Sequence, residues 1–429
     1  MVYFLIIKYY FILKWGCRKM TTQDQTFISL ISTMGRVLLA ESGEGTIMIE
    51  RQLHQVAATY GYRLNTLCLS EYLEIKTYRD AEQIDHLIVQ ATPGIASLSR
   101  ISAVKTLLHA VEQGLALKVA DDKMQEIATA PAMYPGWLRV IGTSFFAMGF
   151  APLVIATWTE VWISGVLGIL SGLLCVVLEK TRFGILFPLI ASFAVGMITL
   201  TFFHDTAMSY GPVFLMIPAL FICIPGDTMS AAAGEIFYGK LTAGSARLIS
   251  AFMCLLQMVI GILLAMEVAN TTLHTLEKGD ISNTMNPFVI LLFVIVFCLG
   301  LCLTFNVPMA YLTWLSIFAI LTYAVQILVS QWTGDLIGTF VAAIVAGVLA
   351  NLATQSPSQP PRVILFISSF FILTVGAKGI EGLSSIIGGY VVEGSREIMA
   401  MIILFPTVTI GIALGYLIST QKKQFPQKN

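Results

Sequence analysis

Proline, glycine and an acidic residue stand together where one apolar segment ends: Pro225, Gly226 and Asp227. Proline lacks a backbone N–H and glycine tolerates unusual backbone angles, so these residues predict a break in a helix. Within a membrane, the backbone groups freed at such a break must be buried in protein or line a cavity. Peptide groups beside a carboxylate can bind a small polar solute or an ion, which is the chemistry of a transporter.

The glycines around this break recur 150 residues later. At that constant offset, Gly226, Gly239, Gly244 and Ser245 correspond to Gly376, Gly389, Gly394 and Ser395. Glycine-interrupted apolar segments at matching places in two halves of a membrane protein indicate a substrate site. Close helix packing also favours small residues, but it does not explain a proline beside a glycine. We therefore interpret the first break as functional.

Charged and amide side chains follow each copy of the pattern. The candidates for binding substrate or a proton are Pro225, Gly226, Asp227, Glu235, Arg247, Gln257, Gly376, Lys378, Glu381 and Arg396. Arg247 and Arg396 stand at predicted helix starts, where they would bind a substrate carboxylate; alternatively, both anchor the chain at the membrane interface. Asp227 or Glu235 would carry a coupling proton; alternatively, they cap helices or pair with Lys240.

Composition places these residues in a membrane protein. The chain of 429 residues is 56% hydrophobic and 12% charged, with a mean hydropathy of +0.81 and no net charge. Soluble globular proteins do not have these values, and no basic block indicates nucleic-acid binding. More than half of the charged residues precede residue 136. The fold class that we predict is a small cytoplasmic α+β domain followed by an all-α integral membrane domain.

About ten transmembrane helices are predicted, several near the ~20 residues that cross a bilayer. They cover residues 137–156, 161–178, 184–203, 211–226, 246–268, 287–304, 308–329, 335–352, 363–377 and 398–418. Lysine and arginine between the spans favour cytoplasmic N- and C-termini. The polar loop at residues 270–286 divides the ten spans into two groups of five. An odd number of spans per group predicts opposite orientations, which is a 5+5 inverted repeat.

The predicted boundaries follow from these patterns. They are a short extension at 1–19, the cytoplasmic domain at 20–135, membrane repeats at 136–269 and 287–420, an external loop at 270–286 and a cytoplasmic tail at 421–429. Residues 1–19 suit neither a span nor a signal peptide, which suggests that the true start is Met20. Within the first domain, periodicity predicts helices at 26–39, 47–60, 98–113 and 118–129, and strands at 65–70, 73–77 and 86–91.

Seven cysteines and five histidines are scattered along the chain. No metal site, cofactor or disulfide framework is expected from that spacing. No phosphate-binding loop of the Walker type occurs either, so direct use of ATP is not expected. We expect the partners to be a small-molecule substrate, a proton and the lipid bilayer, with a homo-oligomeric state left open.

The order of these motifs resembles that of the threonine/serine exporter family. The matching residues are Ile224-Pro225-Gly226, Ala232, Glu235, Gly239 and Gly244-Ser245-Ala246-Arg247-Leu248, with Gly35–Leu39, Ser42-Gly43, Thr46 and Glu50 in the first domain and Phe340–Ala343, Asn351 and Gly376 in the second half. The chain departs from the family pattern at Gly234, where arginine is frequent, and at Val375, where proline is usual. The resemblance covers about residues 21–418. It implies a secondary exporter of threonine and serine in the bacterial cytoplasmic membrane, driven by the proton motive force.

Three other functions stay open at this point. A related two-chain form of the family is associated with succinate, so another dicarboxylate is an alternative substrate. Ser42 beside Gly43 would suit a membrane-bound hydrolase, although no G-x-S-x-G elbow surrounds it. A scaffold whose first domain senses a metabolite is the third alternative. The sequence favours a transporter over an enzyme, with alternating access at the glycine-broken helices.

Overall fold

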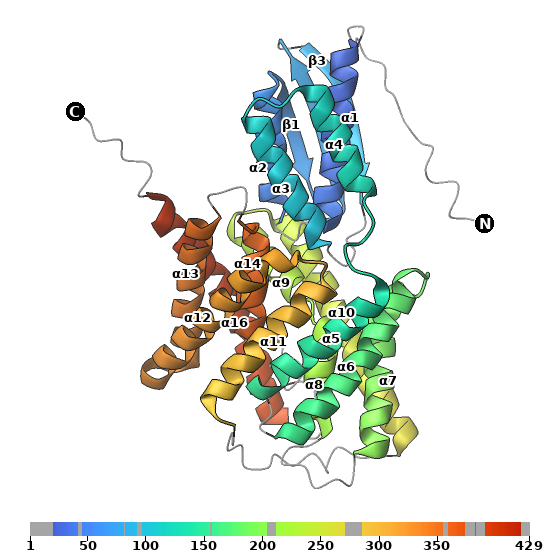
Figure 1. Ribbon diagram of the computed structural model, residues 1–429, viewed down its shortest axis with the longest axis vertical. Helices are drawn as coiled ribbons and strands as arrows, with labels where there is room; N and C mark the ends of the chain where they lie inside the picture. The colour runs from blue at the N-terminus through green and yellow to red at the C-terminus, as the bar shows by residue number, and fades with distance from the viewer. Residues whose placement is uncertain are drawn as a thin grey trace.

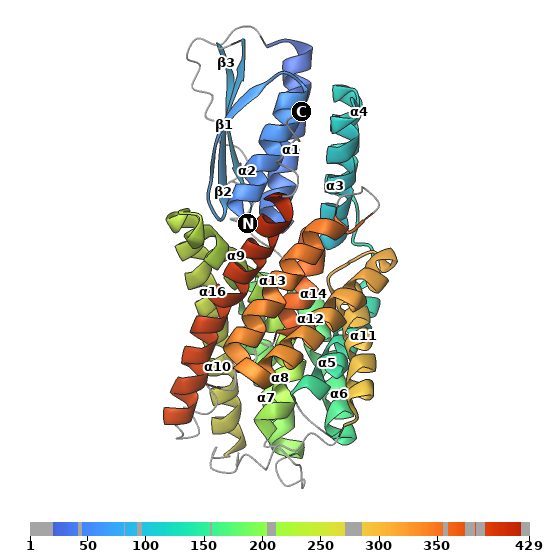
Figure 2. The same cartoon turned by 90° about the vertical axis from the view of Figure 1, so that its left-hand side faces the viewer.

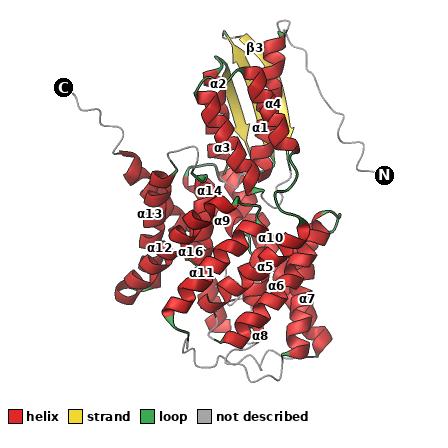
Figure 3. Ribbon diagram, viewed as in Figure 1, coloured by secondary structure: helices red, strands yellow, loops and turns green. Residues whose placement is uncertain are grey.

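The computed structural model describes residues 20–41, 45–80, 82–91, 97–154, 157–203, 212–270, 285–354, 359–373, 382 and 391–421. The first elements form an N-terminal unit, residues 22–129, that stands at one end of a helical bundle formed by residues 136–421 (Figures 1 and 3). The unit comprises α1 (Thr22–Glu41), α2 (Thr46–Thr59), β1 (Arg63–Cys68), β2 (Tyr72–Arg79), β3 (Glu82–Gln90), α3 (Leu98–Glu112) and α4 (Leu117–Thr129).

Amphipathic periodicity explains the N-terminal unit. The strands form one antiparallel sheet in the order β1-β2-β3, and the helices cover one of its faces (Figure 2). On β2, alternate residues such as Leu73 and Ile75 are buried, as period-two alternation requires. They pack against Phe27, Leu30 and Leu53 of α1 and α2 in one hydrophobic cluster. The predicted helices and strands of this region are confirmed, with ends shifted by a few residues.

The bundle is entirely helical in its described residues. Its α-helices are α5 (Gly136–Phe150), α6 (Trp158–Glu179), α7 (Phe187–Phe202), α8 (Pro212–Leu220), α9 (Gly226–Phe237), α10 (Leu241–Ala269), α11 (Pro287–Thr304), α12 (Leu312–Thr333), α13 (Asp335–Ala353), α14 (Arg362–Ile372) and α16 (Val391–Gln421). Short 3-10 turns join some of them: η1 (Ala151–Leu153), η2 (Gly184–Leu186), η3 (Phe221–Cys223) and η5 (Met309–Tyr311).

Seven of the described helical segments are long and apolar enough to cross a membrane. They lie in α6, η2–α7, α10, α11, η5–α12, α13 and α16. Some of the predicted spans are shorter helices instead. The fourth corresponds to α8 and η3 and ends at the first residue of α9, and the ninth corresponds to α14, with 11 residues. The chain is therefore a multi-pass membrane protein.

Elements of the bundle recur at nearly constant spacing. The described residues of α8 begin at Pro212, and α14 begins 150 residues later, at Arg362. Helices α5 and α11 begin 151 residues apart, and α7 and α13 begin 148 apart. Similar packing accompanies the spacing, because α7 packs on α10 and α13 packs on α16. A spacing close to that of the glycines therefore also separates α5 from α11, α7 from α13 and α8 from α14.

Helices α5 and α11 lie against each other with almost no space between their backbones. A Cβ on Gly149 would lie 2.2 Å from the backbone nitrogen of Phe297, and a Cβ on Gly142 would lie 2.5 Å from Cβ of Leu303. The residue numbers rise on one helix as they fall on the other, so the two helices are antiparallel. Glycine is required here because any larger side chain would separate the two backbones.

Candidate functional site

The predicted break at Pro225-Gly226 separates two short helices. Helix α8 ends at Leu220, η3 follows, and Ile224 is extended (φ −70°, ψ 120°) before α9 begins at Gly226. The Gly226 N–H donates to the Ile224 carbonyl oxygen at 2.8 Å across Pro225, which is an inverse γ-turn. Proline suits that turn because its φ is fixed near the required value. The sequence-based prediction of a helix break is confirmed at this position.

Gly226 is in direct contact with the other half of the bundle. A Cβ on Gly226 would lie 2.5 Å from Cε1 of Phe370, on α14. The aromatic ring of Phe370 therefore covers the first residue of α9, and both residues are buried. Because α14 corresponds to α8 at the 150-residue offset, the break in one half is covered by the matching helix of the other.

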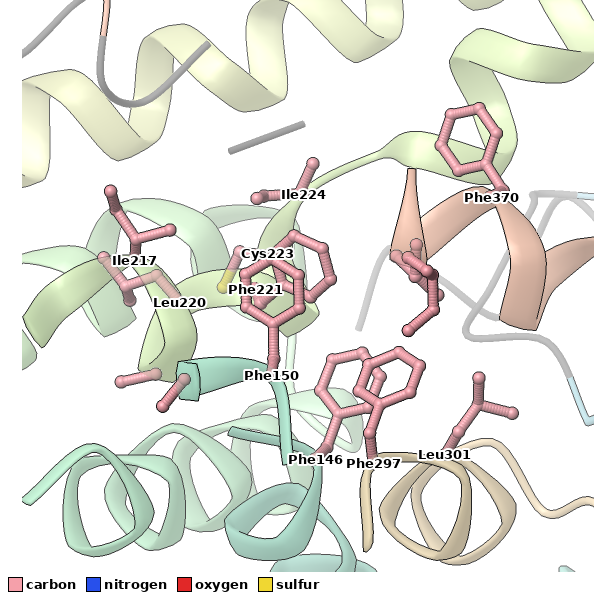
Figure 4. Close-up of a cluster of buried hydrophobic side chains, with 14 of the residues drawn as sticks. Phe146, Phe150, Ile217, Leu220, Phe221, Cys223, Ile224, Phe297, Leu301 and Phe370 are labelled. Atoms are coloured by element: carbon pink, nitrogen blue, oxygen red, sulfur yellow. The ribbon is translucent and has the colours of Figure 1, made fainter. Parts of the chain in front are cut away.

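Phenylalanine side chains fill the space beside this break (Figure 4). The ring of Phe221 stacks on Phe150 with centroids 3.7 Å apart, and Phe146 stacks on Phe297 at 4.8 Å. Phe221 also contacts Phe371, its counterpart at the 150-residue offset, at 5.2 Å. Equivalent residues of the two halves thus meet in a closed apolar cluster. In this conformation aromatic rings pack the region around the break.

A buried ion pair lies at the end of the bundle that faces the N-terminal unit. Oε1 of Glu235, on α9, is 3.2 Å from Nε of Arg247, on α10. Their side chains are 2% and 10% exposed, so both charges have lost most of their contact with water. The N–H of Thr46 donates to the same carboxylate oxygen at 2.8 Å. Glu235 therefore binds the first residue of α2 and the guanidinium of Arg247 together.

Further contacts hold the N-terminal unit on the turn between α9 and α10. Nζ of Lys240 donates to Oε2 of Glu50 at 2.9 Å, and the same carboxylate accepts from the N–H of Cys68. Ser70 Oγ donates to the carbonyl oxygen of Ala243 at 3.0 Å. Burial, with the nearby Glu50 carboxylate, raises the pKa of Cys68 to about 12, so its thiol stays protonated. We name these residues together with Thr46, Glu235 and Arg247 the docking contact.

The structure brings together only part of the predicted site. Gly226 and Glu235 lie on α9, directly after Pro225, and Arg247 lies on α10. Arg247 is not at a helix start, since α10 begins six residues earlier, at Leu241. That prediction was wrong because the first turns of α10 are polar and fall outside the apolar span. Glu235 pairs with Arg247, whereas Lys240, its predicted alternative partner, pairs with Glu50.

Other predicted site residues lie elsewhere. Gln257 is half-buried on α10, and its Oε1 has no hydrogen-bond partner among the described residues. Arg396 is exposed and lies inside α16 rather than at its start. The backbone of Asp227 lies in α9, whereas its side chain is outside the described part of the chain. The predicted residues Gly376, Lys378 and Glu381 also fall outside the described residues.

Sequence reasoning named Thr46 and Glu50 but not their partners in the docking contact, and it did not single out Phe370 at all. The sequence did contain a signal that a helix begins at Thr46, because glycine is a common N-cap residue and Gly45 precedes an amphipathic segment. In the described part of the chain, no three metal-binding side chains gather.

The sequence was compared with known families and proteins. The family described as "Putative threonine/serine exporter" matches residues 29–269, more than half of the chain, and the family described as "Threonine/Serine exporter, ThrE" matches residues 290–421. A curated protein of Mycobacterium tuberculosis (strain ATCC 25618 / H37Rv), the "Probable threonine/serine exporter", is 26% identical over 276 residues. The match covers 62% of this chain and 52% of that protein, so the chain spans about half of its length. No solved structure matches the chain.

Proposed function

We propose, from the premise that this chain belongs to the threonine/serine exporter family, that it exports threonine and serine by proton-coupled alternating access. Family membership indicates a transporter rather than an enzyme. The substrate, the proton coupling and the direction of transport belong to the proposal. The curated relative is described as a probable exporter of the same two amino acids, which agrees with this choice of substrate.

The observation that carries the proposal is the meeting of equivalent elements around a broken helix. Helices α5 and α11 are equivalent in the repeat and antiparallel, and Phe221 contacts its counterpart Phe371. These contacts support an inverted repeat of two five-helix halves. Such a repeat lets one central site open to either side by the same motion, performed by one half or by the other. The aromatic cluster would close the path in the described conformation.

The ion pair between Glu235 and Arg247 suggests how a substrate carboxylate would be bound. In the described conformation Glu235 neutralises Arg247. A substrate carboxylate could take the place of Glu235, because a guanidinium binds carboxylates of either origin equally well. Glu235 would then be released from both Arg247 and Thr46. Substrate binding on α10 would thereby loosen the docking contact of the N-terminal unit.

The proposal includes a location for each part of the chain. The N-terminal unit lies at the end of the bundle where Lys240 and Arg247 are found, and positive residues favour the cytoplasmic side. We therefore assign both the unit and the C-terminal end to the cytoplasm of a cell whose inner membrane holds the bundle. The domain limits would be 20–135 for the unit, and 136–269 and 287–420 for the two halves.

Gly226 gives the sharpest test of this proposal. Cells that produce the chain are preloaded with a threonine-containing dipeptide, and threonine efflux is measured with and without an uncoupler. Gly226→Leu should reduce efflux at least tenfold at equal membrane content, because the new side chain would overlap the ring of Phe370. A partial return of efflux in Gly226→Leu combined with Phe370→Ala would locate the defect at this contact.

Gly234, on the same helix, provides the matched control. A Cβ at Gly234 would have Thr409 Cγ2 at 3.6 Å, an ordinary contact, so Gly234→Ala should keep full efflux. A fully active Gly226→Leu variant would exclude the break from the transport path. If wild-type cells export no threonine, the substrate assignment is wrong, and efflux of succinate from preloaded cells becomes the next assay.

A further inference from the structure

A buried carboxylate lies in the bundle, on a helix that the proposed substrate site does not use. Glu160 lies in the first turn of α6, and only 1% of its surface is exposed. One carboxylate oxygen, Oε2, accepts a hydrogen bond from the hydroxyl of Thr157, the N-cap of the helix. The other oxygen, Oε1, is buried and has no partner among the described residues. Such a free carboxylate oxygen can take up a proton.

No described cation balances Glu160. Helix α6 packs against α5, α7, α8, η1 and η2. Among the described residues of those five elements, Arg139 on α5 is the sole charged or titratable side chain, and it pairs with Glu179 at 2.8 Å, at the other end of α6. An unbalanced buried charge is strongly unfavourable, so ionisable residues inside membrane segments mark ion and proton pathways. A proton on Glu160 removes the charge.

Two serines lie on the same side of α6 as Glu160, farther along the helix. Ser164 and Ser171 are both fully buried, and both hydroxyl oxygens lack partners among the described residues. At 100° per residue, Glu160, Ser164 and Ser171 lie within about 40° of one another on the helix. The glycines that pack on α5, such as Gly168, lie on an adjacent side. Serine hydroxyls can both donate and accept, so the row suits water molecules or a moving proton.

The row covers about half of a membrane crossing. From Glu160 to Ser171 the helix rises about 16.5 Å, against the ~30 Å of a bilayer core. Residues 309–315 of the second half, which begin η5 and α12, contain no carboxylate. Buried hydroxyls do occur on α12, at Ser316 and Thr322. At this place the carboxylate, rather than the hydroxyls, distinguishes the first half from the second.

We propose that Glu160 is the carboxyl that binds and releases the coupling proton, with Ser164 and Ser171 extending its path along α6. The carboxylate takes a proton at Oε1 to form the neutral acid, and the same O–H bond breaks when the proton passes on. This inference rests on the proposed function, because it names a residue for its proton coupling. It assigns the substrate to the Pro225 break and Arg247, and the proton to a different helix.

The test uses the full chain in lipid vesicles. Two transport modes are measured: threonine accumulation driven by a pH gradient, and threonine exchange at equal pH. Glu160→Gln keeps the size of the side chain and the capping contact with Thr157. We expect at least a tenfold loss of gradient-driven accumulation and less than a threefold loss of exchange. Glu267→Gln, an exposed carboxylate in the last turn of α10, should change neither.

A chemical readout separates the two proposals. Dicyclohexylcarbodiimide adds the O–H of a protonated carboxyl across one of its C=N bonds, which leaves an O-acylisourea on the carboxyl. Mass spectrometry should find this mass on the peptide containing Glu160, with labelling that falls as pH rises. Gradient-driven accumulation that survives in Glu160→Gln would overturn the inference, as would an unlabelled Glu160 in wild-type protein. Wild-type vesicles that move no threonine but carry a pH-dependent label on Glu160 would refute the proposed substrate and leave the proton site standing.

Discussion

The contact between α5 and α11 and the docking contact of the N-terminal unit are built from opposite chemistry. At the first, Gly142, Gly149 and Gly300 let two backbones touch, and a Cβ on Gly300 would lie 2.1 Å from the backbone nitrogen of Phe146. At the second, carboxylates meet a guanidinium and an ammonium group. Tight apolar contacts have no substitute partner, whereas ion pairs can exchange partners with water, salt or a substrate. The α5–α11 contact is therefore suited to stay closed, whereas the docking contact is suited to open.

The largest effect should come from filling the α5–α11 contact. Gly149→Leu places a side chain on the backbone of Phe297, which no rotamer change can relieve. We expect a loss of about 3 kcal/mol in stability, the upper end for overpacked cores, and a large drop in the monodisperse fraction on size-exclusion chromatography in detergent. Val166→Leu, at a side chain 65% exposed on α6, is the control. A well-folded Gly149→Leu variant would show that this contact is not rigid.

A smaller and more local effect is expected from Glu235→Ala. The change leaves the buried guanidinium of Arg247 unpaired, which typically costs about 3–5 kcal/mol at a fully buried pair and less where one side reaches water. Amide hydrogen exchange should rise in the first turn of α2, where the Thr46 N–H loses its acceptor, and stay unchanged in α5. Glu235→Met with Arg247→Met removes the unpaired charge but not the loss of that acceptor, so it should regain only part of the protection. Equal losses in the single and double variants would mean that the ion pair does not hold the unit.

The smallest effect is expected from Lys240→Ala. Its ion pair with Glu50 is partly exposed, with side-chain exposures of 35% and 16%, and such pairs contribute less than about 1 kcal/mol. Exchange in α2 should rise slightly at low salt and match that of wild type at high salt, because ions screen exposed charges. If Lys240→Ala loosened the unit as much as Glu235→Ala does, burial would not distinguish the two pairs.

The sequence predicted regular elements better than it predicted contacts between them. Strand β2 was expected at 73–77 and is found at Tyr72–Arg79, because alternation of apolar residues is a local property. The pairing of Glu235 with Arg247 depends on the angle between α9 and α10, which no local pattern encodes. The contact of Thr46 with Glu235 joins residues 189 apart in the chain. A single sequence gives no signal for such a distant pair.

Glu160 was missed for a different reason. The predicted span began at residue 161, where the apolar run starts, whereas the helix begins at Trp158. Thr157 followed three residues later by Glu160 is a capping-box pattern, and it would have extended the helix correctly. Attention to helix caps at span ends would therefore have placed one more carboxylate inside the membrane region.

The antiparallel contact of α5 with α11 also has a consequence for biosynthesis. Helix α5 leaves the ribosome about 150 residues before the partner that its glycines fit, a wait of roughly 8 to 30 s at 5–20 residues per second. During that interval α6, which packs on another side of α5, is the neighbour already made. The nascent first half must therefore persist in the membrane with an exposed glycine surface, which makes it a target for membrane chaperones and proteases until synthesis reaches α11.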